Sequence, residues 1–417
     1  MRRDPSSEPK RAAAEKIVQG LREAGHTALL AGGCVRDLLL GVPPKDYDVA
    51  TDAPPPVVTQ LFRRTRTVGA KFGVVLVRMG GVDVEVATFR SEGAYSDGRR
   101  PDTVTFTGPQ EDAQRRDFTI NGMFYDPVEQ RVIDYVGGQD DLKARVLRAI
   151  GDPERRFAED HLRMLRAIRL AARLGFTIDP ATFRAIQHHA AELRDISRER
   201  IRMELEMILT HASRSTAWTL LHQSGLDAHL MPPAAWDESA ALSFAGRLAA
   251  LPPDARLPTA LAAVLRDSAP PQAAEMLHTA TYSNETVQDV TWLLASLPAL
   301  LEPDKLDLAD VKLLAADPRF ADLLQLAQAE YRVLGRDRAP LERLQARIAA
   351  LDPESLAPPR LITGEDLLAW GVPAGPVYAR VLEQVYRAQL NGTFTTRDEA
   401  LALARKLAQP DSERLRG

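Results

Sequence analysis

The spacing of apolar residues changes near residue 137 and divides the chain into two kinds of structure. Before that point, short apolar runs bounded by glycine and proline predict a mixed α/β region. The expected helices cover residues 10–24, 35–40 and 54–62, and the expected strands cover 26–30, 47–50, 73–79 and 82–89. The pair Gly80–Gly81 between the last two runs predicts a β-hairpin.

Beyond residue 137 the strand patterns end, and alanine, leucine, arginine and glutamate recur at helical spacing. This spacing predicts one helix over residues 158–174 and another over 197–210, followed by roughly eight to ten more towards the C-terminus. In the first region, the segment 91–109 is polar and glycine-rich and contains two prolines. It therefore predicts a mobile loop.

The composition indicates a globular protein with more than one core. The 417 residues are 45% hydrophobic, which is enough for roughly two or three domains. Since 53 Lys and Arg nearly balance 57 Asp and Glu, a nucleic-acid partner needs a local basic groove. The single cysteine, Cys34, allows no internal disulfide and no cysteine-based zinc site. Without a long apolar run or a secretory signal, we expect a cytoplasmic protein and no membrane contact.

Two aspartates, Asp46 and Asp48, lie two residues apart on or beside a predicted strand. Residues at this spacing point to the same face of a strand, so their carboxylates converge and repel each other. Bound divalent cations relieve such repulsion, and oxygen ligands suit Mg²⁺ or Mn²⁺. A pair of turn aspartates after a Pro-Pro sequence explains the pattern equally well.

Glu85 lies among valines on the second strand of the predicted hairpin, where a charged side chain needs a partner. A third carboxylate beside Asp46 and Asp48 completes a two-metal site. Such a site activates an attacking hydroxyl and stabilises a leaving pyrophosphate. The alternative is a charge that keeps an edge strand soluble.

Gly32 and Gly33 separate a predicted strand from a predicted helix. Glycines let the backbone approach a phosphate, the helix N-terminus favours its charge, and Arg36 adds a forked donor. A tight turn also explains the double glycine. The Asp-x-Asp pair that begins ten residues after Arg36 makes the combination specific.

The sequence from Gly32 to Asp37, together with Asp46-Tyr47-Asp48, resembles motif A of the polymerase-β-like nucleotidyltransferases. It is most similar to their class II branch, the bacterial tRNA CCA-adding enzymes and poly(A) polymerases. Further segments resemble the ribose-binding, hinge, nucleobase-selecting and neck-closing motifs of that family, in the family's order: 115–121, 137–151, 159–166 and 196–204.

This resemblance implies an α+β fold, with a polymerase-β-like nucleotidyltransferase head built on a mixed sheet and an all-α neck, body and tail. The boundaries that we expect are 1–24 for an N-terminal helix, 25–150 for the head, 151–212 for the neck that selects the nucleobase, and 213–417 for the body and tail that bind tRNA. The implied activity is template-independent addition of C, C and A, from CTP and ATP, to the 3′ end of tRNA. Pyrophosphate is released when the RNA 3′-hydroxyl attacks the α-phosphate.

The resemblance also implies roles for individual residues. Asp46 and Asp48 hold two Mg²⁺ ions, and Glu85 assists at the ion that activates the hydroxyl. The remaining nucleotide contacts are phosphate contacts from Gly32, Gly33, Arg36, Arg116 and Arg166, and ribose contacts from Asp117 and Asn121.

Base selection is expected from Asp160 and Arg163, which lie three residues apart on the predicted helix 158–174 and so share a face. A carboxylate accepts from the exocyclic amine of cytosine or adenine, and a guanidinium donates to the adjacent ring nitrogen. Guanine and uracil fail both contacts. Each failure costs about 1–3 kcal/mol, so two give about one to four decades of discrimination. A surface ion pair is the ordinary alternative at this spacing.

RNA contacts are expected from Arg169 and Arg173 on the same helix, with a solvated arginine stripe as the alternative. Arg99 and Arg100 lie in a loop that resembles the flexible loop of class II enzymes, and we expect them to contact RNA as well. In that family an intact loop goes with addition of the terminal A. The few histidines lack the spacing of a metal-dependent hydrolase, so no phosphohydrolase domain is expected.

Two other functions stay open at this point. One is a poly(A) polymerase or an enzyme that adds only A, although the chain lacks the basic Arg-Phe-Arg-Leu-like stretch usual in bacterial poly(A) polymerases. The other is a catalytically silent RNA-binding protein, against which the complete acidic triad argues. No obligatory protein partner is evident.

Overall fold

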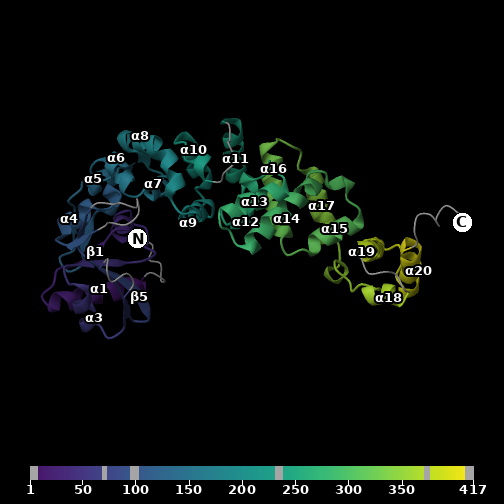
Figure 1. The fold of residues 1–417 in the computed structure, drawn as a ribbon, viewed down its shortest axis with the longest axis horizontal. Helices are drawn as coiled ribbons and strands as arrows, with labels where there is room; N and C mark the ends of the chain where they lie inside the picture. Colours follow the sequence, from purple (N-terminus) through teal and green to yellow (C-terminus); the bar gives the residue numbers. More distant parts are fainter. Residues whose placement is uncertain (1–7, 68–72, 94–102, 231–237, 371–375, 409–417) are drawn as a thin grey trace. The chain divides into compact units, whose positions relative to one another are not determined.

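The computed structural model describes residues 8–67, 73–93, 103–230, 238–370 and 376–408, and the statements below concern these residues (Figure 1). Its contacts divide the chain into two compact units. The first comprises residues 1–242 with 279–281, and the second comprises residues 243–278 with 282–417. Arg99 and Arg100 lie outside the described residues.

A seven-stranded mixed sheet, in the order β3-β4-β5-β2-β1-β8-β9, forms the centre of the N-terminal region. Its strands are β1 Ala28–Ala31, β2 Asp48–Thr51, β3 Thr65–Thr67, β4 Val74–Met79, β5 Val82–Thr88, β8 Phe124–Asp126 and β9 Arg131–Ile133. Strands β4 and β5 form the antiparallel hairpin predicted around Gly80–Gly81. Strand β5 also pairs in parallel with β2, which places Asp48 opposite Glu85.

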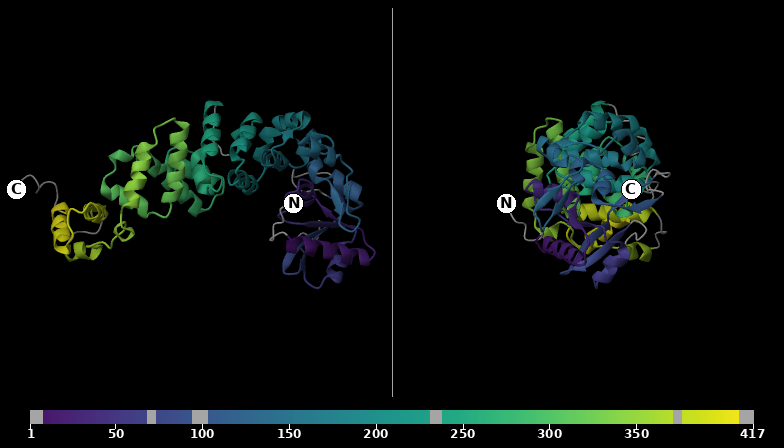
Figure 2. Two further views of the ribbon diagram at one scale, coloured as in Figure 1. Left: turned by 180° about the vertical axis from the view of Figure 1, so that it is seen from behind. Right: turned by 90° about the vertical axis from the view of Figure 1, so that its left-hand side faces the viewer.

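The helix α1, Glu8–Glu23, packs against β1, β2 and β5 of this sheet (Figures 1 and 2). Its buried residues repeat at the spacing of an amphipathic helix: Ala13, Ala14, Ile17, Val18 and Leu21. The short helices of the same region are α2 Gly33–Leu39, α3 Pro55–Leu61, α4 Pro109–Gln114 and α5 Gly138–Ala144. The helices predicted before residue 63 are therefore confirmed.

Helices follow the sheet in the first unit: α6 Pro153–Glu159, α7 Leu162–Leu174, α8 Pro180–His189, α9 Arg198–Leu209 and α10 Arg214–Gln223. The prediction for α9 is confirmed, but the single helix predicted over 158–174 is wrong. Asp160 has an extended backbone with φ −151°, and its side chain accepts from the backbone N–H of Leu162 at 3.1 Å. This contact satisfies a free donor at the start of α7, so the chain ends one helix and begins another here.

The polar segment 91–109 is only partly a loop. Strand β6, Arg90–Glu92, pairs antiparallel with β7, Val104–Phe106, and residues 94–102 between them lie outside the described residues. A second small pair, β10 Val146–Leu147 with β11 Thr177–Ile178, occurs where no strand was expected. Two-residue strands are too short to leave a period in the sequence.

The second unit is helical in its described part. Its helices, counted from α11, which straddles the two units, are α11 Glu238–Ala250, α12 Leu257–Val264, α13 Pro270–Thr279, α14 Asn284–Leu301, α15 Leu308–Ala316, α16 Phe320–Val333, α17 Ala339–Ala349, α18 Gly364–Ala369, α19 Pro376–Leu390 and α20 Arg397–Ala408. Leu367, Val381, Val385 and Phe394 form an apolar cluster near the C-terminus. Among the described helices, none is both long and apolar enough to cross a membrane.

Candidate active site

Three carboxylates lie on the central strands of the sheet. Asp48 begins β2, Glu85 lies opposite it on β5, and Asp46 precedes β2 in the connecting loop. All three side chains are exposed. The parallel pairing of β2 and β5 therefore brings Asp48 and Glu85 together, as the sequence led us to expect, whereas Asp46 lies outside the strand.

Like charge and partial burial act on Asp48. Desolvation, followed by repulsion from Glu85, raises the pKa of Asp48 from 3.8 to about 6; Asp46 adds to the repulsion and Arg116 opposes it. The side chain reaches solvent, but the surrounding protein displaces enough water to disfavour the charged form. A cation at this position would relieve the same strain.

The three residues fit a hard divalent cation, because every donor is a carboxylate oxygen. Neither Asp48 nor Glu85 forms an ion pair with any described residue. Asp46 is engaged: its Oδ1 accepts from Lys10 Nζ at 2.8 Å, and the same ammonium donates to the Lys45 carbonyl. Asp46, Asp48 and Glu85 are not among the groups of described residues whose ligand atoms all lie within 4.8 Å of one another.

The Gly32 turn lets an arginine approach the backbone next to these carboxylates. Gly32 has φ +75°, a conformation that side chains rarely adopt, and a Cβ there would lie 3.0 Å from Arg116 Nη1. Gly33 is the first residue of α2. The Arg116 guanidinium donates twice to buried Asp112 and lies 5.1 Å from the centre of the Phe124 ring.

Arg36, expected to contact phosphate, is buried with 7% of its surface exposed. Its Nη1 donates to Asn121 Oδ1 at 2.7 Å, and its Nε donates to Asp37 Oδ1 at 2.8 Å. Asn121 Nδ2 in turn donates to Asp117 Oδ1 at 3.1 Å. The Arg36 guanidinium is therefore engaged with Asn121 and Asp37 and orients the expected ribose-binding pair, Asp117 and Asn121. It does not offer two unpaired N–H donors to a phosphate.

Asp117 and Arg166 form the other end of this network. Arg166 Nε and Nη2 donate to Asp117 Oδ2 at 3.0 and 2.6 Å. Burial alone raises the pKa of Asp117, but the charge and hydrogen bonds of Arg166, helped by Asn121 and the Phe118 N–H, lower it to about 2. Asp117 is thus ionised throughout the physiological range, and Arg166 remains partly exposed beside it.

The expected base-selecting pair is not a pair in this structure. Asp160 lies between α6 and α7, where both its oxygens accept from Arg200 Nη2 at 3.1 and 2.9 Å. Arg163 lies in α7 with 9% of its surface exposed and donates to Glu159 Oε2 at 2.6 Å. The prediction that Asp160 and Arg163 share one face of a single helix is therefore wrong. The alternative, an ion pair between the two side chains, is wrong as well.

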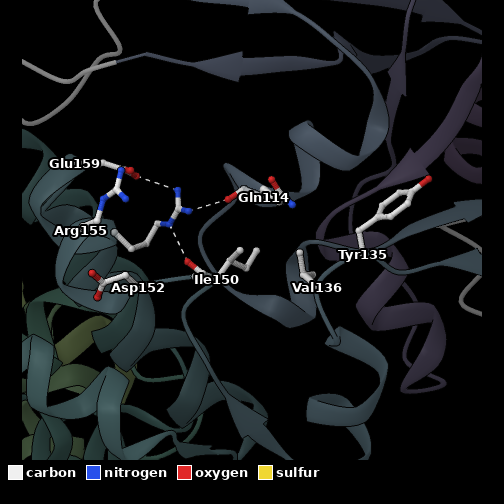
Figure 3. Close-up of a pocket in the computed structure, with 9 residues that line it drawn as sticks. Gln114, Tyr135, Val136, Ile150, Asp152, Arg155 and Glu159 are labelled. Carbon is white, nitrogen blue, oxygen red and sulfur yellow. Dashed lines mark hydrogen bonds and ion pairs between the residues drawn. The ribbon is translucent and has the colours of Figure 1, made fainter.

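Arg156 connects this region to the head. It donates to the carbonyls of Gln114, Arg115 and Ile150 at 2.7, 3.2 and 3.2 Å, and to Glu159 Oε2 at 2.9 Å. A pocket of about 400 Å³ opens beside it, lined among others by Tyr135, Ile150 and Glu159 (Figure 3). No carboxylate of the β2–β5 pair is among its described lining residues.

The expected RNA-binding arginines of α7 differ in their surroundings. Arg169 Nε donates to buried Glu204 Oε2 at 2.7 Å, so its charge is neutralised within the fold. Arg173 is exposed and forms no ion pair with a described residue. Both line a pocket of about 180 Å³ with Lys45 and His211. Burial, then the charge of Arg173, lowers the pKa of His211.

Sequence reasoning did not pair these residues with the side chains that hold them: Lys10, Asp112, Glu159, Arg200 and Glu204. Each is an ordinary charged residue of a helix in the sequence, and most of them meet partners that are distant along the chain. Glu159, Arg200 and Glu204 lie in the segments 159–166 and 196–204 that resemble family motifs, and this is the signal that could have found them.

Comparison with protein-family models matches residues 28–148 to the "Poly A polymerase head domain" and residues 175–237 to the "Probable RNA and SrmB- binding site of polymerase A". The chain is 34% identical to the CCA-adding enzyme of Geobacillus stearothermophilus over 388 residues, which cover 92% of this chain and 94% of that one. It is 36% identical to the CCA-adding enzyme of Lactiplantibacillus plantarum, with 93% and 94% coverage.

The fold agrees with these relatives. The crystal structure of the Bacillus stearothermophilus CCA-adding enzyme in complex with CTP aligns with a TM-score of 0.79 at 32% identity and covers 99% of both chains. The Thermotoga maritima CCA-adding enzyme complexed with tRNA aligns with a TM-score of 0.66 at 22% identity and shares the fold. Because relatives of at least 34% identity align along nearly its whole length, the chain belongs to the family of CCA-adding enzymes.

Proposed function

We propose that this chain adds C, C and A, from CTP and ATP, to the 3′ end of tRNA and releases pyrophosphate. The observation that carries this proposal is the register of β2 and β5, which sets Asp48 opposite Glu85 in a head that matches the family model. The relatives at 34–36% identity are CCA-adding enzymes, and one solved relative is a complex with CTP.

In the proposed reaction Asp46 and Asp48 would hold two Mg²⁺ ions, and Glu85 would assist at the ion beside the 3′-hydroxyl; bound there, the ions would favour ionisation of that hydroxyl and stabilise the charge of the leaving pyrophosphate. The raised pKa of Asp48 supports this assignment, because desolvation and then repulsion from Glu85 disfavour its charged form, and a bound cation would offset both. The Lys10 ammonium forms an ion pair with Asp46, and this ion pair has to break before the Asp46 carboxylate can bind a metal ion.

The nucleotide is proposed to lie along the network that runs from Arg36 to Arg166. Asp117, ionised with a pKa of about 2, accepts hydrogen bonds from the ribose hydroxyls, and the amide of Asn121 can accept from them or donate to them. The Gly32–Gly33 backbone and Arg116 receive the phosphates, and Arg166 adds charge at the partly exposed end. Arg36 acts indirectly, because its hydrogen bond fixes the position of the Asn121 side chain.

Base choice is proposed to lie with Asp160 and Arg163, which accept from and donate to the shared edge of cytosine and adenine. In the structure their partners are Arg200 and Glu159. A nucleobase therefore has to compete with these ion pairs, and only a base that satisfies both groups compensates their loss. Glu159, shared by Arg156 and Arg163, links this choice to the head.

The RNA is proposed to lie across the basic pocket with Lys45, Arg173 and His211, where exposed Arg173 is available for a phosphate. Arg169 contributes less, because Glu204 neutralises it. Arg99 and Arg100 complete the proposed contacts on the head side. The division that we propose is a catalytic head at 25–150, a base-selecting neck at 151–212, and a tRNA-binding body and tail at 213–417.

The test is sequencing of the product made from a tRNA that lacks its CCA end, with CTP and ATP both supplied. The proposal requires the sequence CCA and then termination. A run of A identifies a poly(A) polymerase, and a single A on a tRNA that already ends in CC, with no C addition, identifies an A-only enzyme. No addition to any tRNA end supports a silent RNA-binding protein.

A further inference from the structure

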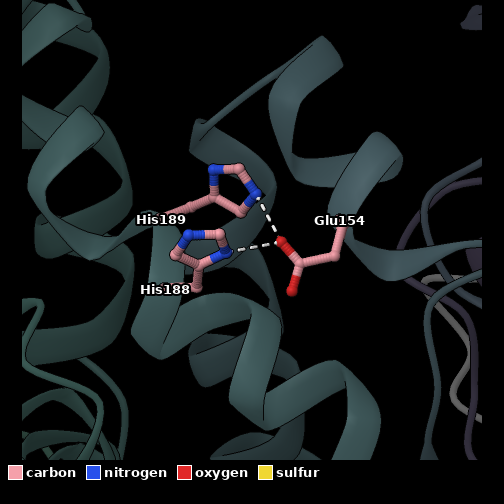
Figure 4. Close-up of side chains that lie close together, drawn as sticks. All are labelled: Glu154, His188 and His189. Atoms are coloured by element: carbon pink, nitrogen blue, oxygen red, sulfur yellow. Dashed lines mark hydrogen bonds and ion pairs between the residues drawn. The ribbon is translucent and has the colours of Figure 1, made fainter.

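We propose that Glu154, His188 and His189, in the helical part of the first unit, form a binding site for a transition-metal ion of the Zn²⁺ class. The three side chains come from two helices, with Glu154 in the first turn of α6 and the histidines in the last turn of α8 (Figure 4). One candidate ligand atom from each lies within 4.8 Å of the others. The site is separate from the carboxylates of β2 and β5.

Both imidazoles address the same carboxylate oxygen. His188 Nδ1 lies 2.8 Å from Glu154 Oε2, and His189 Nε2 lies 2.9 Å from it. Two imidazole nitrogens thus converge on one carboxylate oxygen, as Figure 4 shows.

Both ring nitrogens of His189 lie within hydrogen-bond distance of a carboxylate. Its Nδ1 lies 2.6 Å from Glu192 Oε2 while its Nε2 faces Glu154 Oε2. A neutral imidazole carries one N–H, so one of these contacts would set a nitrogen lone pair against a carboxylate oxygen. A metal ion between Nε2 and Glu154 would satisfy both sides of the ring, with Nε2 as its ligand and Nδ1–H as the donor to Glu192.

The contact to Glu192 is the one that a metal ligand needs. Histidines that bind metals usually donate their other N–H to a carboxylate, which fixes the tautomer and directs the free nitrogen at the ion. Glu192, in the 3₁₀ turn Ala190–Asp195, supplies this carboxylate. His161 Nδ1 lies 3.2 Å from the same Glu192 oxygen and completes an outer layer around His189.

The ligand chemistry selects the class of ion. Two imidazole nitrogens and one carboxylate suit Zn²⁺ and its neighbours rather than Mg²⁺ or Ca²⁺. With metal–ligand bonds of about 2.0–2.1 Å, tetrahedral ligand atoms lie roughly 3.3 Å apart. The present contacts of 2.8 and 2.9 Å need to open by only about half an ångström. Water can fill the fourth position, since Glu154 and His188 are exposed.

An ion at this position would fasten α6 to α8 beside the proposed base-selecting residues. Glu154 and Glu159 lie on the same short helix, and His161 follows Asp160 directly in the chain. Binding would therefore stiffen the segment from which Asp160 and Arg163 act. It requires no nucleotide and no RNA, so it can be tested apart from the proposed activity.

The experiment is a Zn²⁺ titration of the full chain, stripped of metal with a chelator, in competition with a chromophoric chelator. We expect one high-affinity ion per chain, and Co²⁺ in its place should give the visible absorption of a tetrahedral complex. His188→Ala should weaken binding at least tenfold, as should Glu154→Gln, which keeps the side-chain shape but removes the charge. Zn²⁺ should also raise the Tm of the wild type by several degrees, and that of these variants much less.

His26→Ala is the matched control, because His26 also contacts a carboxylate, Asp52, at 3.0 Å, but belongs to no group of converging ligands among the described residues. It should bind Zn²⁺ like the wild type. His188 is 74% exposed, so its replacement leaves the fold intact, which circular dichroism checks. The proposal is overturned if the wild type shows no high-affinity Zn²⁺ binding. It is also overturned if the His188→Ala and Glu154→Gln variants bind Zn²⁺ as tightly as the wild type.

Discussion

Replacing Asp48 with asparagine should abolish nucleotide addition and, without metal, make the protein more stable. Folding raises the pKa of Asp48 from 3.8 to about 6, so its ionised form is favoured less in the folded chain than in the unfolded one. The resulting cost is nearly absent below about pH 4, grows between about pH 4 and 6, and is complete above about pH 6. The asparagine side chain carries no charge and escapes this cost.

The size of the gain follows from the same values. An increase in pKa from 3.8 to about 6 corresponds to about 3 kcal/mol if no solvent screens the charge. Because the Asp48 side chain is exposed at the surface, screening lowers this figure, and we expect a gain of about 1 kcal/mol at pH 8. For a unit of this size the gain corresponds to a rise in Tm of about 2–4 °C.

The assay is thermal unfolding of the wild type and the variant in chelator at pH 8 and pH 4, followed by the same scans with Mg²⁺. Asp46→Asn is the control: it also removes a proposed metal ligand, but it breaks the ion pair with Lys10 and should not stabilise the protein. Mg²⁺ should raise the Tm of the wild type more than that of either variant. A chelator-treated Asp48→Asn variant less stable than the wild type at pH 8 would refute this account of the site.

Three further predictions concern the residues around the site. Lys10→Ala frees Asp46 from a partly exposed ion pair, so the Mg²⁺ concentration that gives half of the maximal rate should fall by up to about fivefold. An unchanged concentration contradicts competition between Lys10 and Mg²⁺ for Asp46. Arg200→Ala removes the partner of Asp160 and should lower kcat/KM for CTP and ATP together by about tenfold or more, whereas Arg202→Ala on the same helix, paired with Glu206, should change neither. Deletion of residues 94–101 spares β6 and β7 and should slow the addition of A to a tRNA that ends in CC more than the addition of C to a tRNA that lacks CCA. Equal slowing of both reactions contradicts a role of these residues in the switch from C to A.

The local pattern of the sequence predicts much of the head. Alternation over residues 82–88 and the Gly80–Gly81 pair lead to the observed hairpin, and the exposed face of β5 carries Glu85 as expected. The pairing of β5 with β2 sets Asp48 opposite Glu85, which is 37 residues further along the chain, and the sequence suggested it only through the partner that Glu85 needs and through the family resemblance. Local periodicity is silent on which strands become neighbours.

The charged contacts of the site were much less predictable. Arginines such as Arg36 and Arg169 look alike in the sequence, yet the first is buried against Asn121 and the second is paired with Glu204. Their partners lie 85 and 35 residues away in the chain. The prediction of one continuous helix through Asp160 failed for a different reason. The Asp160 side chain accepts a hydrogen bond from the first turn of the following helix, and the continuous apolar spacing of the sequence gives no sign of this local contact.

The central claim is that the protein itself chooses the base at the 3′ end of tRNA, through Asp160 and Arg163. The most direct measurement is competitive incorporation of all four nucleoside triphosphates onto one tRNA lacking CCA, by the wild type and the Asp160→Ala variant. We predict that the wild type makes CCA, and that the variant uses CTP and ATP less and loses about ten- to a hundredfold of its preference over UTP and GTP. A variant that keeps the full preference for C and A would contradict the claim.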